Sequence, residues 1–362
     1  MGIAKHHYVP ALKWRMGEYQ ALFRLSDAQK DAITPLIMIP PREYDFEELR
    51  MKKTIHEHIE PFAKRMLNKW GTRPAIIDIH DSLEEAIMNS GDRVYPYIFE
   101  KLRELECNAI PVINFRRGGL FSSDIIQLIA TDSQGVALRI SLEDLMTPSI
   151  NSDISSKLYE LQVNRSETDL IIDLQEPESF EPYTDFSAAL ASTIGDIDHL
   201  TQFRSFVITG MSLKLSNIKK PGNVTPRHEW NLYKQLAADL VDLRVPSYGD
   251  YTIETPQFAE QDMRKMKPAG KIVYTSEDSW FVTKGSAFRD NPAQMQDHCR
   301  IVVGSGHYCG ANYSYGDKRI QDTLNGTTNT GNLSTWKQVG VNHHLAKVVD
   351  QLASFHASGT GP

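Results

Sequence analysis

The chain has 362 residues, 41% of them hydrophobic and 23% charged, and its formal net charge at neutral pH is −7. This composition is ordinary for a soluble globular protein and excludes a disordered or collagen-like chain. The acidic balance excludes a polycation, so a nucleic-acid site would have to be a local basic cleft.

Short runs rich in β-branched and aliphatic residues recur along the chain. They predict strands at Tyr8–Trp14, Pro35–Ile39, Pro74–Ile79, Ala109–Phe115, Gly135–Ile140, Asp169–Leu174 and Ser205–Thr209. A weaker eighth strand is expected within RVPSYGDYTI, residues 244–253, where Pro246 cannot donate to a ladder. The runs are nearly continuously apolar, which is typical of parallel strands buried on both faces.

Amphipathic helical patterns separate these strands, for example in Glu57–Trp70 and Arg93–Leu105. Another helix is expected over Arg227–Leu240, with Thr225 as its cap and Pro226 at the first helical position. Eight strands alternating with helices predict a (β/α)8 barrel, an α/β fold, over residues 1–255. An open doubly wound sheet is the alternative, but no Gly-rich turn follows the first strand.

The pattern of alternating strands and helices ends before residue 265, and a different pattern follows. KIVYTSEDSWFVTKG predicts a hairpin, Asn291–Val303 a helix, Gly304–Asn332 a long ordered loop, and His343–Ser354 a last helix capped by Asn342. We expect residues 256–355 to form an α+β appendage packed on the barrel, and residues 356–362 to form a disordered tail.

The carboxyl ends of barrel strands face the active site, so polar residues there are candidates for function. We expect catalytic carboxylates at Glu18, Asp78, Asp173 and Asp250. We expect ligand-binding side chains at Lys13, Arg15, Arg116, Arg139, Tyr248 and Tyr251. Several cations facing a few carboxylates suit an anionic substrate, with a carboxylate left for acid–base work or metal binding.

Each of these candidates also has a structural interpretation. KWRMGE, residues 13–18, would serve equally as a solvated turn with a salt bridge, and Asp78 and Asp173 could pair with Arg116 or Arg139 as structural bridges. The run Arg116-Arg117-Gly118-Gly119 resembles a phosphate-binding loop, and a plain loop before a helix explains it as well.

The first and eighth strands of a closed barrel are neighbours, so KWRMGE and SYGDY should meet although they are far apart in sequence. Gly249 would permit the close backbone approach there, and Asp250 would bond with Lys13 or Arg15.

The sequence gives little support for disulfide bonds, metal or serine hydrolase motifs, or membrane segments. Three cysteines without a CxxC pair argue against a disulfide framework and a cysteine zinc cluster, and HExxH and GxSxG are absent. No apolar run approaches the ~20 residues that span a bilayer, and the N-terminus lacks the apolar core of a signal peptide. We therefore expect a cytoplasmic protein with no membrane partner.

An ordered set of motifs is similar to the phage- and bacterium-encoded beta family proteins: YVPALKWRMGEYQAL, RHEWNLY, SYGDY, WFVTKG, the loop ending in YGD, and W…NHHLAKVV. The resemblance covers residues ~8–350. It implies a role in phage–host conflict, and the family offers no catalytic assignment to carry over. The shared positions add Lys284, Asn342 and His343 to the expected ligand-binding residues.

Two functions follow from these observations. The first is a nuclease- or phosphodiesterase-like hydrolase for nucleic acid or a nucleotide, whose carboxylates activate water directly or through Mg²⁺ or Mn²⁺. The second is a non-catalytic binding or scaffold component of a defence system, with a protein partner. A third, sugar hydrolysis, fits a basic mouth poorly. An enzyme predicts two carboxylates and a cation in one solvent-filled pocket, and a scaffold predicts those groups mutually paired in a closed mouth.

Overall fold

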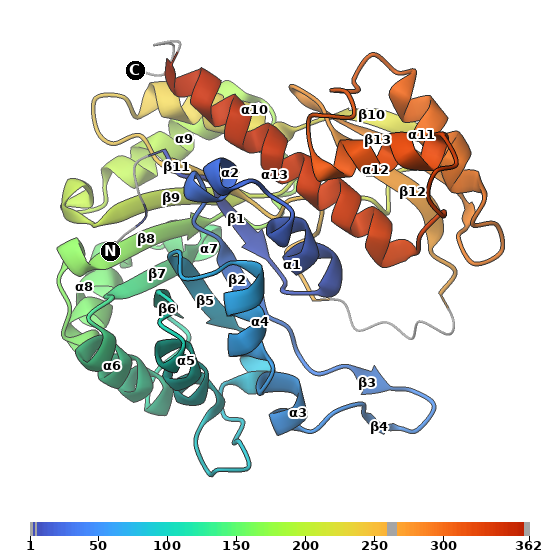
Figure 1. The fold of residues 1–362 in the computed structure, drawn as a ribbon. Coiled ribbons are helices and arrows are strands. Elements are labelled where there is room, and N and C mark those ends of the chain that lie inside the picture. The colour runs from blue at the N-terminus through green and yellow to red at the C-terminus, as the bar shows by residue number, and fades with distance from the viewer. Residues whose placement is uncertain (1–2, 4–5, 259–265, 358–362) are drawn as a thin grey trace.

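A computed structural model describes residue 3, residues 6–258 and residues 266–357. Its centre is a closed barrel of parallel strands in the order β1-β11-β9-β8-β7-β6-β5-β2 (Figure 1). The strands are β1 (Val9–Leu12), β2 (Leu36–Ile39), β5 (Ala75–Ile79), β6 (Ala109–Ile113), β7 (Val136–Ser141), β8 (Thr168–Asp173), β9 (Ser205–Gly210) and β11 (Ser247–Asp250). The predicted (β/α)8 fold is confirmed, and all eight expected strands are present.

Helices follow the strands and cover the outside of the barrel. Ser26, Thr54 and Ser141 each cap the helix that follows them by accepting a hydrogen bond from a backbone N–H three residues on. The helices are α1 (Met16–Phe23), α2 (Asp27–Asp31), α3 (Ile55–Ile59), α4 (Phe62–Lys69), α5 (Val94–Glu104), α6 (Leu120–Asp132), α7 (Leu142–Leu145), α8 (Ile150–Leu161), α9 (Tyr183–Gly195) and α10 (His228–Asp239). A short hairpin of β3 (Tyr44–Asp45) and β4 (Arg50–Met51) projects from the barrel after β2 (Figure 1).

The barrel closes between its first and last strands. Val9 pairs with Gly249, and Pro10 pairs with Asp250. A Cβ atom added at Gly249 would lie 2.8 Å from the Val9 carbonyl oxygen and 2.9 Å from Thr209 Cβ. The strand that precedes KWRMGE therefore pairs with the strand formed by Ser247–Asp250, and their approach requires a residue without a side chain at 249.

The appendage is built on an antiparallel sheet in the order β10-β13-β12. Its strands are β10 (Gly222–Pro226), β12 (Ala269–Thr275) and β13 (Ser279–Ala287), and α11 (Gln294–Val303) and α12 (Tyr315–Leu324) complete it. The predicted hairpin is thus β12 and β13. β10 comes from the stretch between β9 and α10, so a segment within residues 1–255 takes part in the appendage sheet.

The last helix, α13 (Leu333–Ala357), belongs to both parts of the fold. It runs from the appendage along the side of the barrel toward α10 (Figure 1). Trp336 and Val339 join the apolar cluster of the appendage, whereas Val341, Leu345, Val348 and Leu352 join the core of the barrel. The division into residues 1–255 and 256–355 stays a prediction, and α13 contributes to the core on each side of it.

Three local predictions are wrong. Thr225 and Pro226 lie in β10, and α10 begins at His228, whose N–H donates to the Ser212 hydroxyl over 3.2 Å. The expected loop Gly304–Asn332 contains α12, which Ser314 caps. The last helix begins at Leu333, because Trp336 and Val339 of its first two turns pack in one apolar cluster with α12 and the sheet.

Asn342 therefore lies inside α13 and does not cap it. Its side chain accepts from Gly316 N–H over 2.9 Å and donates to the Ala21 carbonyl over 3.0 Å. At the C-terminal end, α13 includes His356 and Ala357 of the predicted tail, and residues 358–362 lie outside the described residues.

Candidate ligand site at the barrel mouth

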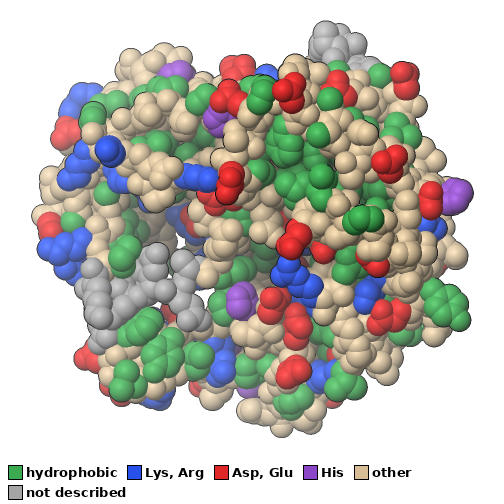
Figure 2. All heavy atoms as spheres, turned by 180° about the vertical axis from the view of Figure 1, so that it is seen from behind, with side chains coloured by type: hydrophobic (Ala, Val, Ile, Leu, Met, Phe, Trp, Pro, Cys, Tyr) green, Lys and Arg blue, Asp and Glu red, His purple; other side chains and the backbone are tan. Residues whose placement is uncertain are grey.

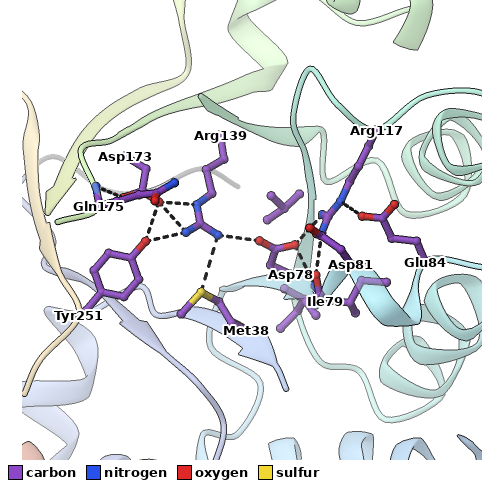
Figure 3. A network of polar contacts seen from close by, with 12 residues as sticks. Met38, Asp78, Ile79, Asp81, Glu84, Arg117, Arg139, Asp173, Gln175 and Tyr251 are labelled. Carbon is purple, nitrogen blue, oxygen red and sulfur yellow. Dashed lines mark hydrogen bonds and ion pairs between the residues drawn. The ribbon is translucent and has the colours of Figure 1, made fainter. Parts of the chain in front are cut away.

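Side chains alternate along each barrel strand between the interior and the surrounding helices. At the carboxyl ends of β5, β7 and β8, the inward positions are held by Asp78, Arg139 and Asp173. Tyr251 reaches the same place just beyond β11. Figure 3 shows the four side chains pointing toward one another across the barrel.

Arg139 is the centre of this polar network. Its Nη1 donates to Asp78 Oδ2 over 2.8 Å, and its Nη2 and Nε donate to Asp173 Oδ2 over 2.6 and 3.0 Å. The Tyr251 hydroxyl accepts from Arg139 Nη2 over 2.7 Å and donates to Asp173 Oδ2 over 2.6 Å (Figure 3). One guanidinium thus ties three strands to the segment after β11, and its hydrogen-bonding capacity is used up.

Arg117 extends the network on the other side of Asp78. Its Nη1 donates to Asp78 Oδ1, its Nη2 to the Ile79 carbonyl, and its Nε to Glu84 Oε1, each over 2.6 Å. Burial alone would raise the pKa of Asp78, but Arg117 and Arg139 outweigh burial and hold that pKa below its ordinary value. Asp78 is therefore a charge-paired anion and a poor proton donor.

Glu84, just past the 3₁₀ turn η1 (Asp81–Leu83), shows the opposite behaviour. Burial raises the pKa of its carboxyl group above the ordinary value although Arg117 opposes the rise, and the neighbouring Asp81 adds to it. Asp78 and Glu84 bond to one guanidinium, yet their pKa values move apart. Such a divergence accompanies a division of labour between acid and base in enzymes.

A cavity of about 430 Å³ opens above the network. Its walls come from the ends of β2, β5, β7 and β8 and from the segments that follow β5, β6, β7, β8 and β11. They consist of Met38, Asp78, Ile79, His80, Asp81, Glu84, Asn114, Arg116, Arg117, Arg139, Ser141, Asp144, Asp173, Gln175, Pro256, Gln257 and Phe258. This is the position at which barrel enzymes bind their substrates.

The two adjacent arginines after β6 have different surroundings. Asn114 Oδ1 accepts from the backbone N–H groups of both Arg116 and Arg117 over 3.0 Å, which fixes a tight turn. Arg117 is buried in the network, whereas 75% of the Arg116 side chain is exposed. Arg116 is 3.8 Å from the carboxylate of Glu143, itself 86% exposed, so this pair is weak.

The candidates on α1 lie outside the cavity. Glu18 is fully buried, and its carboxylate accepts from the backbone N–H groups of Lys13 over 3.3 Å and Arg15 over 3.0 Å. It therefore holds the first turn of α1, beside the exposed Arg15. Their catalytic and ligand-binding roles stay predictions, and the geometry gives Glu18 a structural one.

The expected bond from Asp250 to Lys13 or Arg15 is wrong. Tyr251 points inward, so the alternation along β11 turns Tyr248 and Asp250 outward, toward α10 and α13. The Asp250 carboxylate accepts from the Tyr8 hydroxyl, from the Tyr248 hydroxyl over 2.9 Å and from Thr252 N–H over 2.9 Å. His344 Nε2 is its fourth partner at 2.9 Å. Asp250 and Tyr248 thus lie beneath α13 and not in the mouth.

The three residues added by the motif resemblance lie in or near the appendage. Lys284 donates to the backbone carbonyls of Leu215, over 3.3 Å, and Ile218. His343 Nδ1 is 2.8 Å from Asp317 Oδ2, and Asn342 joins α13 to α1 and α12. Among the described residues, the cavity walls include none of the three, and their ligand-binding roles stay predictions.

Sequence reasoning missed Glu84, Met38 and Phe258, and it did not select Arg117. Arg117 stands beside Arg116 at the carboxyl end of β6, and composition does not tell which of two adjacent arginines turns inward. Glu84 follows a 3₁₀ turn and belongs to no motif. A rule that places every acidic residue soon after a barrel strand near the mouth would have included it.

The described residues contain no group of three or more His, Cys, Asp or Glu side chains placed to hold a metal ion. The face turned away in Figure 1 carries Lys and Arg side chains interspersed with Asp and Glu (Figure 2). Within residues 3, 6–258 and 266–357, no helix has both the length and the apolar character needed to cross a membrane.

Comparison with known families gives one match that spans most of the chain. The family described as Beta protein matches residues 8–350. A comparison with curated proteins gives no match.

Proposed function

The chain belongs to the beta protein family, and we propose that its barrel mouth binds a small anionic ligand that carries phosphate, such as a nucleotide, in the cytoplasm. The resemblance to this family supports a place in phage–host conflict. The charged groups of the mouth support the ligand class.

Arg116 is the observation that carries the proposal. Of the three arginines in the cavity walls, Arg117 and Arg139 are held by hydrogen bonds to carboxylates and, for Arg117, to a backbone carbonyl. Arg116 is exposed, weakly paired, and free to direct its planar guanidinium at a ligand. Guanidinium groups match the geometry of phosphate oxygens through two parallel hydrogen bonds.

The surroundings of Arg116 favour close approach by such a group. A Cβ atom added at Gly118 or Gly119 would meet nothing within 4 Å, so the loop before α6 borders open space. Asn114, Gln175 and His80 add neutral polar groups to the walls. The cavity volume of about 430 Å³ is within the ~300–1,000 Å³ of small-molecule sites.

If the ligand is hydrolysed, Glu84 is the carboxyl group best suited to transfer a proton. Burial raises the pKa of its carboxyl group above the ordinary value, which is the direction that favours a proton donor. Asp78 and Asp173 then keep Arg117 and Arg139 in place. This assignment moves the proposed acid–base role from the predicted carboxylates to Glu84.

The alternative is a binding or scaffold protein without catalysis, joined to a partner of a defence system. The mutual pairing of Asp78, Arg139 and Asp173 favours it, because a scaffold predicts such pairing. The open cavity above the same groups favours the enzyme. The pairing of the charged groups and the open cavity thus favour different functions, and a binding experiment distinguishes them.

Isothermal titration calorimetry with inorganic phosphate, mononucleotides, dinucleotides and short single-stranded oligonucleotides, with and without Mg²⁺ or Mn²⁺, tests the proposal. We expect at least one phosphate-bearing compound to bind, and Arg116→Ala to weaken it about tenfold, equivalent to ~1.4 kcal/mol. Arg289→Ala is the matched control, because Arg289 is an exposed arginine of the appendage with its nearest carboxylate, that of Asp290, at 3.7 Å.

Equal affinity of wild type and Arg116→Ala, or no binding by any compound, would refute the proposal. Product analysis with the bound compound then separates the two functions. Turnover by wild type that Glu84→Gln abolishes without loss of binding supports the hydrolase. Binding without turnover supports the non-catalytic alternative.

A further inference from the structure

A short segment after β11 forms one wall of the cavity. We call residues Glu254–Phe258 the strap. The strap has no regular secondary structure, and its Pro256, Gln257 and Phe258 all line the cavity. Its position therefore sets the shape of the mouth.

Lys13 lies beneath the strap. It follows β1 at an inward position, and only 4% of its surface is exposed. Its Nζ donates to the Gln257 carbonyl and lies 4.9 Å from the centroid of the Phe258 ring. The ammonium group thus binds the strap through both a hydrogen bond and a cation–π contact.

The strap has a second contact, with the segment that follows β5. The Phe258 ring meets the His80 ring edge-on, with centroids 5.2 Å apart and planes at 90°. His80 follows β5, so Phe258 links the β1 and β5 sides of the barrel end. A strap released from Lys13 would lose the contact that orients its ring toward His80.

Four charged groups act on Lys13. Glu254 of the strap and Glu18 of α1 favour the ammonium form, while Lys337 of α13 and Arg15 oppose it. Burial is the largest influence, and together they lower the pKa of Lys13 to about 8. The charge that the cation–π contact requires, and that strengthens the hydrogen bond to Gln257, is therefore lost in mildly alkaline solution.

We propose that Lys13 is the positioning residue that seats the strap over the barrel mouth and so completes the wall of the ligand cavity. Seating of the strap follows from the contacts of Lys13 alone. The consequence for affinity rests on the function proposed above. Lys13 thus acts on the ligand through the strap, whereas the sequence placed it among the ligand-binding residues.

Chymotrypsin tests the seating without any ligand. The protease cleaves after Phe258 only when that ring leaves its place, and mass spectrometry identifies fragments that end at Phe258. We expect Lys13→Met to be cut there several-fold faster than wild type. Lys284→Met is the matched control, because Lys284 also donates to backbone carbonyls but lies away from the mouth. Cleavage of Lys13→Met at the wild-type rate would overturn the proposal.

Lys13→Arg keeps the test decisive if Lys13→Met fails to fold, because arginine keeps its charge at alkaline pH. Wild type and Lys13→Arg should be cut at Phe258 at similar rates at pH 7, and wild type several-fold faster at pH 9. If the ratio of the wild-type cleavage rate to that of Lys13→Arg is the same at both pH values, the role of the Lys13 charge is refuted.

The affinity of the compound identified by calorimetry should fall several-fold in Lys13→Met and be restored in Lys13→Arg. If no compound binds wild type, the proposed function fails, and the cleavage assays still decide on the strap. If a compound binds and strap cleavage is unchanged in Lys13→Met, the strap proposal alone fails.

Discussion

His343 and His344 are adjacent in α13, and each binds a carboxylate in a different part of the fold. His343 Nδ1 lies 2.8 Å from Asp317 Oδ2 in α12, and His344 Nε2 lies 2.9 Å from Asp250 Oδ2 at the end of β11. Neighbouring residues of a helix point about 100° apart, so one helix can serve both partners. This pair of contacts joins the appendage to the barrel.

Burial of His344 predicts loss of stability in acid. Burial lowers the pKa of His344 below 6.5, although Asp250 opposes the shift, so the unfolded chain takes up this proton at a higher pH than the folded protein does. Stability should be fully present above about pH 6.5 and should decrease as the pH falls below it. Asp250, whose pKa His344 holds below 3.8 against the effect of burial, adds a further loss at lower pH.

Urea unfolding of wild type and His344→Gln between pH 7 and pH 5 measures this effect. One proton corresponds to a slope of at most about 1.4 kcal/mol per pH unit, and the wild-type slope should exceed that of His344→Gln by a part of this value. Equal slopes would show that His344 does not contribute.

Removing Arg139 should destabilise the protein strongly. Arg139→Ala leaves the buried carboxylates of Asp78 and Asp173 without their shared cation, and breaking a buried pair in this way costs about 3–5 kcal/mol. Asp78 keeps Arg117 as a partner, so the double variant with Asp173→Asn removes the uncompensated charge and should recover part of the loss. Thermal and urea unfolding report both effects, and additive losses in the double variant would contradict this account.

Glu18 and Arg15 should respond oppositely to truncation. Glu18→Ala removes the acceptor of two backbone N–H groups in a fully buried position and should cost about 2 kcal/mol. Arg15→Ala removes an exposed side chain and should change stability by less than about 0.5 kcal/mol. A large loss of stability in Arg15→Ala would contradict this account.

Gly249→Ala should weaken closure of the barrel. The new methyl group would lie 2.8 Å from the Val9 carbonyl oxygen, and overpacking of this kind costs about 1–3 kcal/mol. Gly118→Ala is the control, because a Cβ atom there meets nothing within 4 Å. A melting temperature of Gly249→Ala equal to that of the control would mean that the strands adjust without cost.

Truncation before α13 should unfold the barrel as well as the appendage. A chain ending at residue 332 lacks Val341, Leu345, Val348 and Leu352, which lie in the barrel core. It also lacks His344, the partner of Asp250. We expect this fragment to aggregate or to lose its cooperative thermal transition. A soluble fragment that melts like the full chain would contradict this expectation.

The sequence was sufficient to predict the barrel, because a strand buried on both faces reads as an apolar run regardless of the details of its ends. The pattern of apolar residues does not determine the residue at which each strand ends. In SYGDY, a change of one position decides whether Asp250 or Tyr251 faces the mouth, and the sequence does not fix where the pleat stops. For the same reason, the sequence does not show which of Arg116 and Arg117 turns inward.

The appendage was harder to predict for a different reason. The residues that begin α12 are Gly, Ser and Tyr, which are typical of loops, and the helix is held by tertiary contacts. Gly316 packs so closely on α13 that an added Cβ would lie 2.5 Å from the Val339 carbonyl oxygen. The Asp317 carboxylate is bound by Tyr274 and His343, which lie far away in sequence. A local sequence pattern does not reveal contacts between residues that lie so far apart in the chain.

Because α13 lies at the C-terminal end of the described chain, one side of the barrel is covered only late in synthesis. All the barrel strands are synthesised before α13, yet Tyr8, Tyr248 and Asp250 stay uncovered until His344 and its neighbours appear. At about 5–20 residues per second, the stretch from Asp250 to Ala357 takes on the order of 10 s to translate. During that interval the nascent chain exposes one flank of an almost complete barrel. Nascent chains should therefore depend on chaperones most strongly at this late stage of synthesis.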